Sequence, residues 1–182
     1  MSTLFLADEA QTLAAGACLA RVWGRRGGVF FLLGELGAGK TTLVRGVLRA
    51  YGHAGAVKSP TYSLLESYRI GGFRLHHLDL YRLNDPEELA YLGFRDLLDG
   101  DALLLIEWPQ RGEEALPVAN LQMELEQRAN GRVLRLSPAG ADVARVAAAL
   151  ASCLRAHRHD GGEGMPLDYL ANVTKKTQSG KG

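Results

Sequence analysis

A glycine-rich segment at residues 34–41 constrains the fold of this chain more than any other feature. It reads GELGAGKT and matches the P-loop pattern G-x-x-x-x-G-K-[ST] at every required position. It directly follows an apolar run, 29–33, and precedes a segment, 41–50, whose apolar residues repeat at helical spacing. A strand, a phosphate-binding loop and a helix in this order predict an α/β domain that binds a nucleotide.

The residues of this loop suit the binding of a di- or triphosphate. Its glycines let successive backbone amides curl around the β-phosphate, and the helix that follows offers unpaired N–H groups to an anion. Lys40 is placed to bridge the β- and γ-phosphates, the Thr41 hydroxyl to coordinate Mg²⁺, and Thr42 to contact the α-phosphate. The nucleotide-binding residues predicted from the loop are Gly34, Gly37, Ala38, Gly39, Lys40, Thr41 and Thr42.

Length and composition favour a single domain. The chain has 182 residues, of which 47% are hydrophobic and 23% charged, as is ordinary for a globular protein. Its apolar runs are far shorter than the ~20 residues that a membrane-spanning helix needs, and the acidic Asp8 and Glu9 lie where a signal peptide would carry basic residues. We therefore expect a cytoplasmic protein without membrane association. The net charge of +1 disfavours direct, high-affinity binding to nucleic acid.

Hydrophobic spacing and turn residues predict the remaining elements. The fold class that follows is α/β, a single P-loop NTPase-like three-layer domain over residues 1–156 whose mixed sheet includes antiparallel hairpins. Residues 157–182 are predicted to be a flexible tail, because small and polar residues dominate there. The predicted elements are a helix over 8–23 that ends at Gly24, a hairpin of 62–70 and 73–80 joined by Gly71 and Gly72, a short helix from Asp85 to Leu92, a buried parallel strand at 103–106, a second hairpin of 121–127 and 133–136 with a type I′ turn at Asn130 and Gly131, and a helix over 141–154.

The two cysteines are Cys18 and Cys153. Each lies in an apolar, helix-like stretch, without C-x-x-C spacing and without clustered histidines. This setting favours buried, reduced thiols over a disulfide or a metal site.

Two acidic residues lie at the ends of predicted strands, where the ligands of open α/β sheets bind. Glu107 directly follows the strand 103–106 and stands where a Walker B acid belongs. Asp79 lies near the end of the first hairpin. From position alone we interpret Glu107 as functional, and Asp79 stays open between a functional and a surface carboxylate.

Three further features have more than one interpretation. His76 and His77 are adjacent on a strand and face opposite sides, which favours packed or exposed histidines over a shared metal. The hydroxyl groups of the segment 59–62, SPTY, can sense a γ-phosphate, although by spacing alone a plain turn is the better interpretation. Trp108 fits either a core position or stacking on a nucleotide ring.

These motifs together resemble the TsaE (YjeE) family, the P-loop ATPases of bacterial tRNA threonylcarbamoyladenosine biosynthesis. They occur in the family's order and spacing over residues of about 8–152. Ser63 stands where many relatives carry threonine, and the tail lies outside the shared pattern. The matching segments are the P-loop extended to Thr42, SPTYSL at 59–64, HLDLYRL at 77–83, EEL at 87–89 and IEWP at 106–109.

The resemblance implies an ATPase that supports N6-threonylcarbamoylation of adenosine 37 in tRNA. It implies that the chain binds the TsaD–TsaB transferase complex, resets it by hydrolysing ATP, and contacts tRNA only indirectly. Mg²⁺ is the implied cofactor, with Thr41 and Glu107 as its ligands, and ATP is the implied substrate. Asp79 joins Lys40 and Glu107 as an implied catalytic residue. The further ATP-binding residues implied by the family are Glu9, Thr61, Trp108 and Arg132.

Two other function classes compete with this one. A P-loop small-molecule kinase would need an acceptor pocket and usually a lid that carries arginines, and the sequence has no evident arginine cluster after its central helix. A non-hydrolysing sensor would use ATP only to order the segment 59–62 for a partner. A GTPase is disfavoured, because no N-K-x-D guanine-reading segment occurs.

Overall fold

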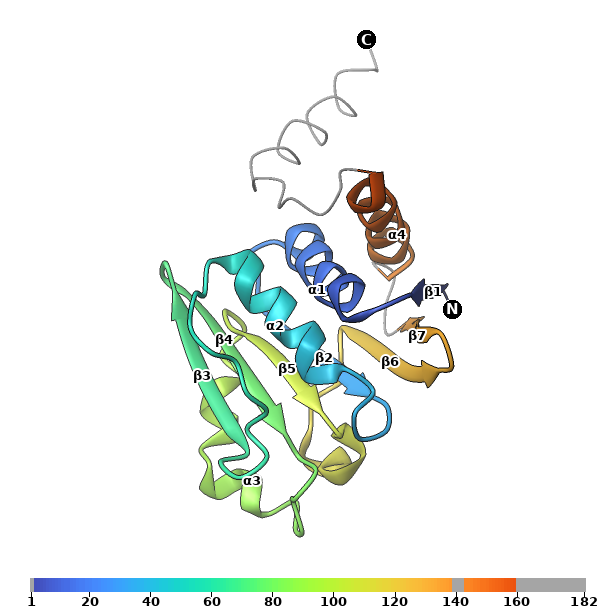
Figure 1. Ribbon diagram of the computed structural model, residues 1–182. Coiled ribbons are helices and arrows are strands. Elements are labelled where there is room, and N and C mark those ends of the chain that lie inside the picture. Colours follow the sequence, from blue (N-terminus) through green and yellow to red (C-terminus); the bar gives the residue numbers. More distant parts are fainter. Residues whose placement is uncertain (1, 139–142, 160–182) are drawn as a thin grey trace.

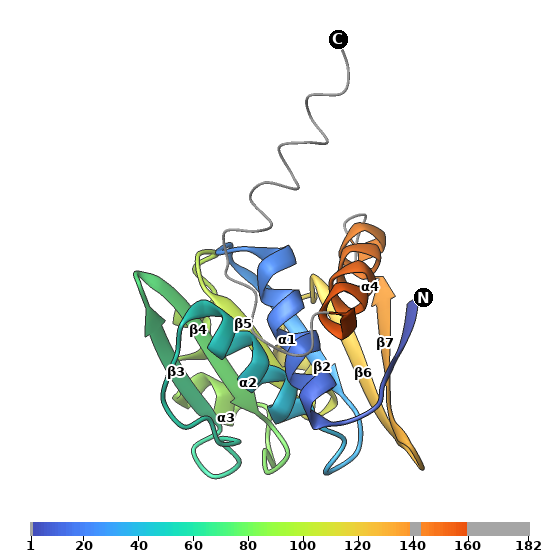
Figure 2. The ribbon, with the colours of Figure 1, turned by 45° about the horizontal axis from the view of Figure 1, so that its top comes forward.

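A seven-stranded sheet lies between two layers of helices in the computed structural model, which describes residues 2–138 and 143–159. Figures 1 and 2 show α1, α2 and α4 on one face of the sheet and α3 on the other. The predicted three-layer α/β fold is confirmed. The strands are β1 (Ser2–Leu6), β2 (Gly28–Leu33), β3 (Leu65–Ile70), β4 (Phe73–Asp79), β5 (Leu103–Glu107), β6 (Leu121–Arg128) and β7 (Gly131–Pro138). The helices are α1 (Glu9–Trp23), α2 (Lys40–Tyr51), α3 (Glu88–Tyr91) and α4 (Val143–His159), with 3₁₀ turns η1 (Phe94–Leu97), η2 (Pro109–Arg111) and η3 (Glu113–Ala115).

The strand order in the sheet is β1-β7-β6-β2-β5-β4-β3. The central strands β6, β2, β5 and β4 run parallel to one another, whereas β3, β7 and β1 pair antiparallel with their neighbours. The carboxyl ends of the parallel strands therefore meet at one edge of the sheet, which is where open α/β sheets bind ligands. The P-loop follows β2 at this edge.

The buried strand β5 separates two hydrophobic cores. Leu103 and Leu105 enter the core under α1, α2 and α4, whereas Leu104 and Ile106 enter the core under α3 and η1. Because strand side chains alternate between faces, Glu107 belongs to the same face as Leu103 and Leu105. The strand thus places its terminal carboxylate on the α2 side of the sheet.

Both helices predicted around the P-loop are confirmed. Asp8 caps α1 by accepting a hydrogen bond from Gln11 N at 2.7 Å, and Gly24 ends the helix with a φ of 74°. Helix α2 begins at Lys40, directly after the glycines of the loop. Among the helices that the structure describes, none has the length and apolar character needed to cross a bilayer.

The first predicted hairpin is confirmed, with Gly71 and Gly72 both at positive φ between β3 and β4. The second hairpin is also present, but the predicted I′ turn at Asn130 and Gly131 is wrong. Arg128 pairs with Gly131, so the connection is Ala129 and Asn130, neither of which has positive φ. Gly131 is required for another reason: a Cβ there would lie 2.4 Å from the Leu6 carbonyl oxygen of the neighbouring strand β1.

Three elements differ from the pattern in the sequence. Strand β1, which the sequence did not indicate, pairs antiparallel with β7 and forms one edge of the sheet. The helix predicted from Asp85 to Leu92 is limited to the four residues of α3, because the preceding residues form a turn in which Asp85 Oδ1 accepts from Glu87 N at 2.9 Å. Helix α4 reaches His159, so it includes the first residues of the predicted tail. The rest of that tail lies outside the described residues.

Cys18 and Cys153 form a disulfide that joins α1 to α4, with 5.8 Å between their Cα atoms. The prediction of reduced thiols is therefore wrong. The two residues are 135 positions apart in sequence and meet only because α4 packs on α1. Local spacing carries no information about such a pairing.

The disulfide gives a testable stability difference. Cys153→Ser is expected to lower the free energy of unfolding by about 2–4 kcal/mol, because the cross-link closes a long loop in the unfolded chain. Urea unfolding of the oxidised protein and of the variant measures this difference. Reductant should destabilise the wild-type protein to the same extent and leave the variant unchanged. Two free thiols titrated in the native, oxidant-treated protein would contradict the pairing.

Candidate nucleotide-binding site

The P-loop connects β2 to α2 at the carboxyl edge of the sheet. Its three glycines, Gly34, Gly37 and Gly39, have φ values of 131°, 79° and 105°. Residues with a Cβ rarely adopt this conformation, so the backbone favours glycine at all three positions, two of which, Gly34 and Gly39, are also fixed by the phosphate-binding pattern. The N-terminus of α2, with its unpaired amides, follows immediately and faces the same space.

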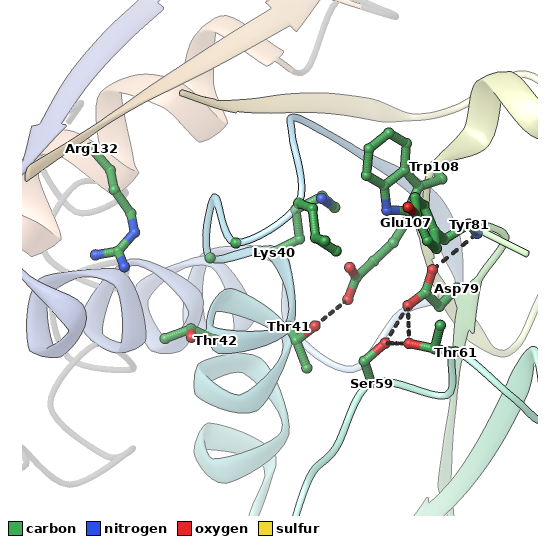
Figure 3. Close-up of a pocket in the computed structure, with 13 residues that line it drawn as sticks. Lys40, Thr41, Thr42, Ser59, Thr61, Asp79, Tyr81, Glu107, Trp108 and Arg132 are labelled. Atoms are coloured by element: carbon green, nitrogen blue, oxygen red, sulfur yellow. Dashed lines mark hydrogen bonds between the residues drawn. The ribbon is translucent and has the colours of Figure 1, made fainter. Parts of the chain in front are cut away.

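A pocket of about 240 Å³ lies at this helix N-terminus (Figure 3). Its walls come from the P-loop, the segment before β3, the ends of β4 and β5 with the residues just after them, and the start of β7. The pocket brings together most of the residues predicted from the sequence. The lining residues are Leu36, Gly37, Gly39, Lys40, Thr41, Thr42, Ser59, Thr61, Asp79, Tyr81, Glu107, Trp108 and Arg132.

Lys40 is buried beneath the loop, with 4% of its surface exposed. Its ammonium Nζ donates to the carbonyl oxygens of Gly34 at 2.7 Å and Glu35 at 2.9 Å, and it lies 4.4 Å from the centre of the Trp108 ring. Burial lowers the pKa of Lys40, and the nearby carboxylates of Glu107, Asp79 and Glu35 oppose that effect. The loop thus holds the buried Lys40 ammonium at the wall of the pocket.

Glu107 stands at the centre of a buried hydrogen-bonded group. Its Oε1 accepts from the Thr41 hydroxyl at 2.8 Å and lies 2.9 Å from Nε2 of His77. Only 3% of Glu107 and none of His77 is exposed. The structure therefore joins the first turn of α2 to the end of β5, and it brings together the two residues predicted to hold a metal.

Asp79, opposite Glu107 on the neighbouring strand β4, is the centre of a second hydrogen-bonded group (Figure 3). Its Oδ2 accepts hydrogen bonds from the hydroxyls of Ser59 and Thr61, the latter at 3.0 Å, and its Oδ1 accepts from the backbone N–H of Tyr81 at 3.1 Å. The Ser59 and Thr61 hydroxyls are themselves 2.7 Å apart. Asp79 is only 4% exposed, so it is not the surface carboxylate that its position in the sequence also allowed.

Trp108 is held at the pocket by the backbone as well as by its ring. It has a φ of 55°, unusual for a residue with a side chain, and its N–H donates to the Leu32 carbonyl at 3.3 Å. Its ring lies 5.1 Å from that of Tyr81. Trp108 thus lines the site, while its partly buried ring also packs against the smaller core.

Arg132 and Glu9 were both predicted from the resemblance to bind ATP. The structure places them in different surroundings. Arg132 lines the pocket from β7, and its Nε donates to the Ala38 carbonyl at 3.0 Å. Glu9 lies in the first turn of α1, where its carboxylate forms an exposed ion pair with Arg45 at 3.2 Å. Glu9 is not among the residues that line the pocket.

Four residues of the site were not singled out from the sequence. Ser59 belongs to the segment considered as a switch, and Tyr81 belongs to the same motif as Asp79, so proximity to those motifs was an available signal. Leu36 lines the pocket as an unspecified position of the P-loop. His77 was predicted to be either packed or exposed rather than a metal ligand; it is buried, and its contact with Glu107 depends on the pairing of β4 with β5.

Comparison with known proteins finds relatives over most of the chain. The family model described as "Threonylcarbamoyl adenosine biosynthesis protein TsaE" matches residues 6–134, a range that includes the whole lining of the pocket. The tRNA threonylcarbamoyladenosine biosynthesis protein TsaE of Haemophilus influenzae is 42% identical over 138 residues, which cover 74% of this chain and 87% of the relative. The Bacillus subtilis protein of the same name is 36% identical over 111 residues, 61% of this chain and 69% of that protein.

The fold has a solved counterpart. The crystal structure of Bacillus subtilis YdiB superimposes on this chain with a TM-score of 0.67 and 26% sequence identity. The superposition covers 82% of this chain and 93% of the other. The superposition shows that the fold of this chain is similar to that of a solved bacterial protein.

Proposed function

This chain belongs to the TsaE family of threonylcarbamoyl adenosine biosynthesis proteins, and on that premise we propose that it is a Mg²⁺-dependent ATPase of tRNA modification. We propose further that it binds the TsaD–TsaB transferase complex in the cytoplasm and resets that complex by hydrolysing ATP. The observation that carries the proposal is the convergence of Lys40, Thr41, Asp79 and Glu107 on one pocket. P-loop ATPases use a cation on the phosphates, oxygen ligands for the metal and a group that orients water.

The P-loop and the start of α2 are the proposed phosphate-binding elements. Residues of the loop and of the first turn of α2 line the pocket, and the dipole of α2 favours an anion at that end. Lys40 supplies a full positive charge from a site with little water, where its effect on a phosphate oxygen is stronger than at the surface. Thr42 also lines the pocket, and we propose that its hydroxyl contacts the α-phosphate.

The hydroxyl of Thr41 and the carboxylate of Glu107 fit a magnesium ion. Both are hard oxygen donors, they lie 2.8 Å apart, and both line the pocket. Mg²⁺ in phosphoryl-transfer sites takes one or two such protein ligands and completes its shell with phosphate oxygens and water. When bound, the ion would neutralise charge on the β- and γ-phosphates.

Asp79 is the proposed group for the attacking water. Two hydroxyl groups and one backbone N–H fix both of its oxygens, so the carboxylate has one orientation at the pocket wall. A water that donates to this carboxylate would be aligned for in-line attack on the γ-phosphate. Because Ser59 and Thr61 bind the same carboxylate, a change in their segment would also move the proposed base.

Hydrolysis by the isolated protein is expected to be slow. Arg132, the arginine among the lining residues, donates to the P-loop carbonyl of Ala38 and stands on the Thr42 side of the site in Figure 3, away from Asp79. A cation supplied by a partner, or a partner that orders the segment 59–61, can raise such a rate by a factor of ~10³–10⁵. We therefore propose that TsaD–TsaB stimulates the turnover.

The experiment is steady-state phosphate release from ATP and Mg²⁺, with and without the TsaD–TsaB complex, with Lys40→Ala and Glu107→Ala as controls. We expect the complex to stimulate phosphate release by the wild-type protein but not by either variant. ATP-dependent binding to the complex without any phosphate release would instead identify a non-hydrolysing sensor. Phosphorylation of a metabolite in a substrate screen, with no stimulation by the complex, would identify a kinase.

Asp79→Asn should separate hydrolysis from binding. The variant keeps the shape of the side chain but loses the carboxylate that accepts a proton from water, so we expect a fall of about 100-fold in the rate of phosphate release. The affinity for Mg²⁺–ATP, measured by calorimetry, should change by less than about threefold because the phosphate and metal ligands are intact. Asp99→Asn, which alters a surface ion pair with Arg74, is the matched control. An Asp79→Asn variant that hydrolyses ATP at the wild-type rate would rule out this role.

A further inference from the structure

The buried imidazole of His77 has no part in the function proposed above, although it touches the carboxylate on which that function depends. The side chain lies on β4 with none of its surface exposed. Its Nε2 is 2.9 Å from Oε1 of Glu107, the same oxygen that accepts from the Thr41 hydroxyl. One carboxylate oxygen is thus held from two directions, by a helix and by a neighbouring strand.

The hydrogen-bond partners of His77 indicate which ring nitrogen carries the proton. Its other nitrogen, Nδ1, is buried and has no hydrogen-bond partner within residues 2–138 and 143–159. A proton on Nδ1 would leave a buried N–H unpaired and face the Glu107 carboxylate with a nitrogen lone pair, whereas a proton on Nε2 is directed at that carboxylate. The arrangement therefore favours the tautomer in which Nε2–H donates to Glu107.

The sheet fixes this contact. Strands β4 and β5 are parallel, with Asp79 opposite Glu107 and His77 opposite Leu105. Residues two apart on a strand share a face, so His77, Asp79 and Glu107 all belong to the side of the sheet covered by α2. His76, next to His77, points the other way and pairs with the hydroxyl of Ser67 through Nδ1 at 2.8 Å.

We propose that His77 is a positioning residue that orients the Glu107 carboxylate toward the metal, an inference that rests on the ATPase function proposed above. With Oε1 held by His77, the carboxylate cannot rotate freely, and no hydrogen bond from the described residues reaches Oε2. The Thr41 hydroxyl can then turn an oxygen lone pair to Mg²⁺ without releasing Glu107. Partners that hold a metal ligand in this way are typically worth 10–100-fold in metal affinity.

The test compares His77→Leu, which removes the donor, with His77→Gln, whose amide N–H₂ can reach the same oxygen. We expect His77→Leu to raise the Mg²⁺ concentration for half-maximal ATP binding, measured by calorimetry, by about 10–100-fold. His77→Gln should restore it to within about threefold of wild type. ATP binding in EDTA should be the same for all variants and reports an intact P-loop. His76→Leu, one residue away on the opposite face, is the matched control and should keep the wild-type Mg²⁺ dependence.

A second measurement does not depend on the folding of a variant. In long-range ¹H–¹⁵N spectra of the wild-type protein, the His77 signals should show a proton on Nε2 and should shift between ATP in EDTA and ATP with Mg²⁺, whereas those of His76 should not. Unshifted His77 signals, or a His77→Leu variant with normal Mg²⁺ dependence, would overturn the positioning role. Wild-type ATP binding that is insensitive to Mg²⁺ would instead overturn the proposed function.

Discussion

Replacement of Lys40 by alanine is expected to lower the rate of ATP hydrolysis about 1,000-fold while the protein stays folded. The variant removes the one full positive charge that the P-loop places within the pocket, and with it the proposed contact to the β- and γ-phosphates. The hydrogen bonds that Lys40 makes inside the protein are to two carbonyl oxygens of the loop, so its loss removes the contact with the Trp108 ring but breaks no hydrogen bond between strands. Phosphate release and thermal unfolding of the same preparation measure the two effects.

The control for this variant is Lys58→Ala. Lys58 has the same charge and lies next to Ser59, but its side chain is exposed and does not line the pocket. It should keep the wild-type rate to within about twofold, because exposed charges are screened by water and salt. If Lys40→Ala hydrolysed ATP at the wild-type rate, the assignment of the P-loop as the phosphate-binding site would be wrong, and the proposed function would lose its main support.

The parts of the fold that were predictable from the sequence are those governed by local chemistry. The P-loop, its strand and its helix were evident because glycine, lysine and threonine stand at fixed positions in one short segment. The hairpin at Gly71 and Gly72 was predictable because a two-residue turn of positive φ selects glycine. The buried strand Leu103–Glu107 was evident from its continuous apolar run. In each case neighbouring residues determine the conformation.

The features that escaped prediction depend on contacts between distant segments. The disulfide joins Cys18 to Cys153, and strand β1 exists because β7 offers an edge to pair with. Position alone left Asp79 open between a functional and a surface carboxylate, because its contact with Ser59 joins two separate segments. The relation of His77 to Glu107 likewise needs the register of two strands. A single sequence contains these residues but not their distances.

Gly46→Val is expected to destabilise the protein by at least about 4 kcal/mol, the second large effect that the structure predicts. Gly46 lies in the middle of α2, where a Cβ would be 2.2 Å from the Leu13 carbonyl oxygen of α1. Gly16 of α1 approaches α2 in the same way, 2.1 Å from the Leu43 carbonyl oxygen. Because the obstacles are backbone atoms, no side-chain rotation can relieve the clash, and the helices must separate. Urea unfolding followed by circular dichroism measures the loss.

Arg49→Val is the matched control, since it introduces the same residue on an exposed position of the same helix. It should cost less than about 1 kcal/mol, which is the difference in helix propensity. Equal stability of the two variants would show that the close approach of α1 and α2 is not needed. If Gly46→Val is less stable than Arg49→Val, a partly folded preparation of Gly46→Val should also bind ATP poorly, because α2 carries Lys40 and Thr41 at its N-terminus. The close contact between α1 and α2 at Gly46, which does not line the pocket, would then be what holds the P-loop in place.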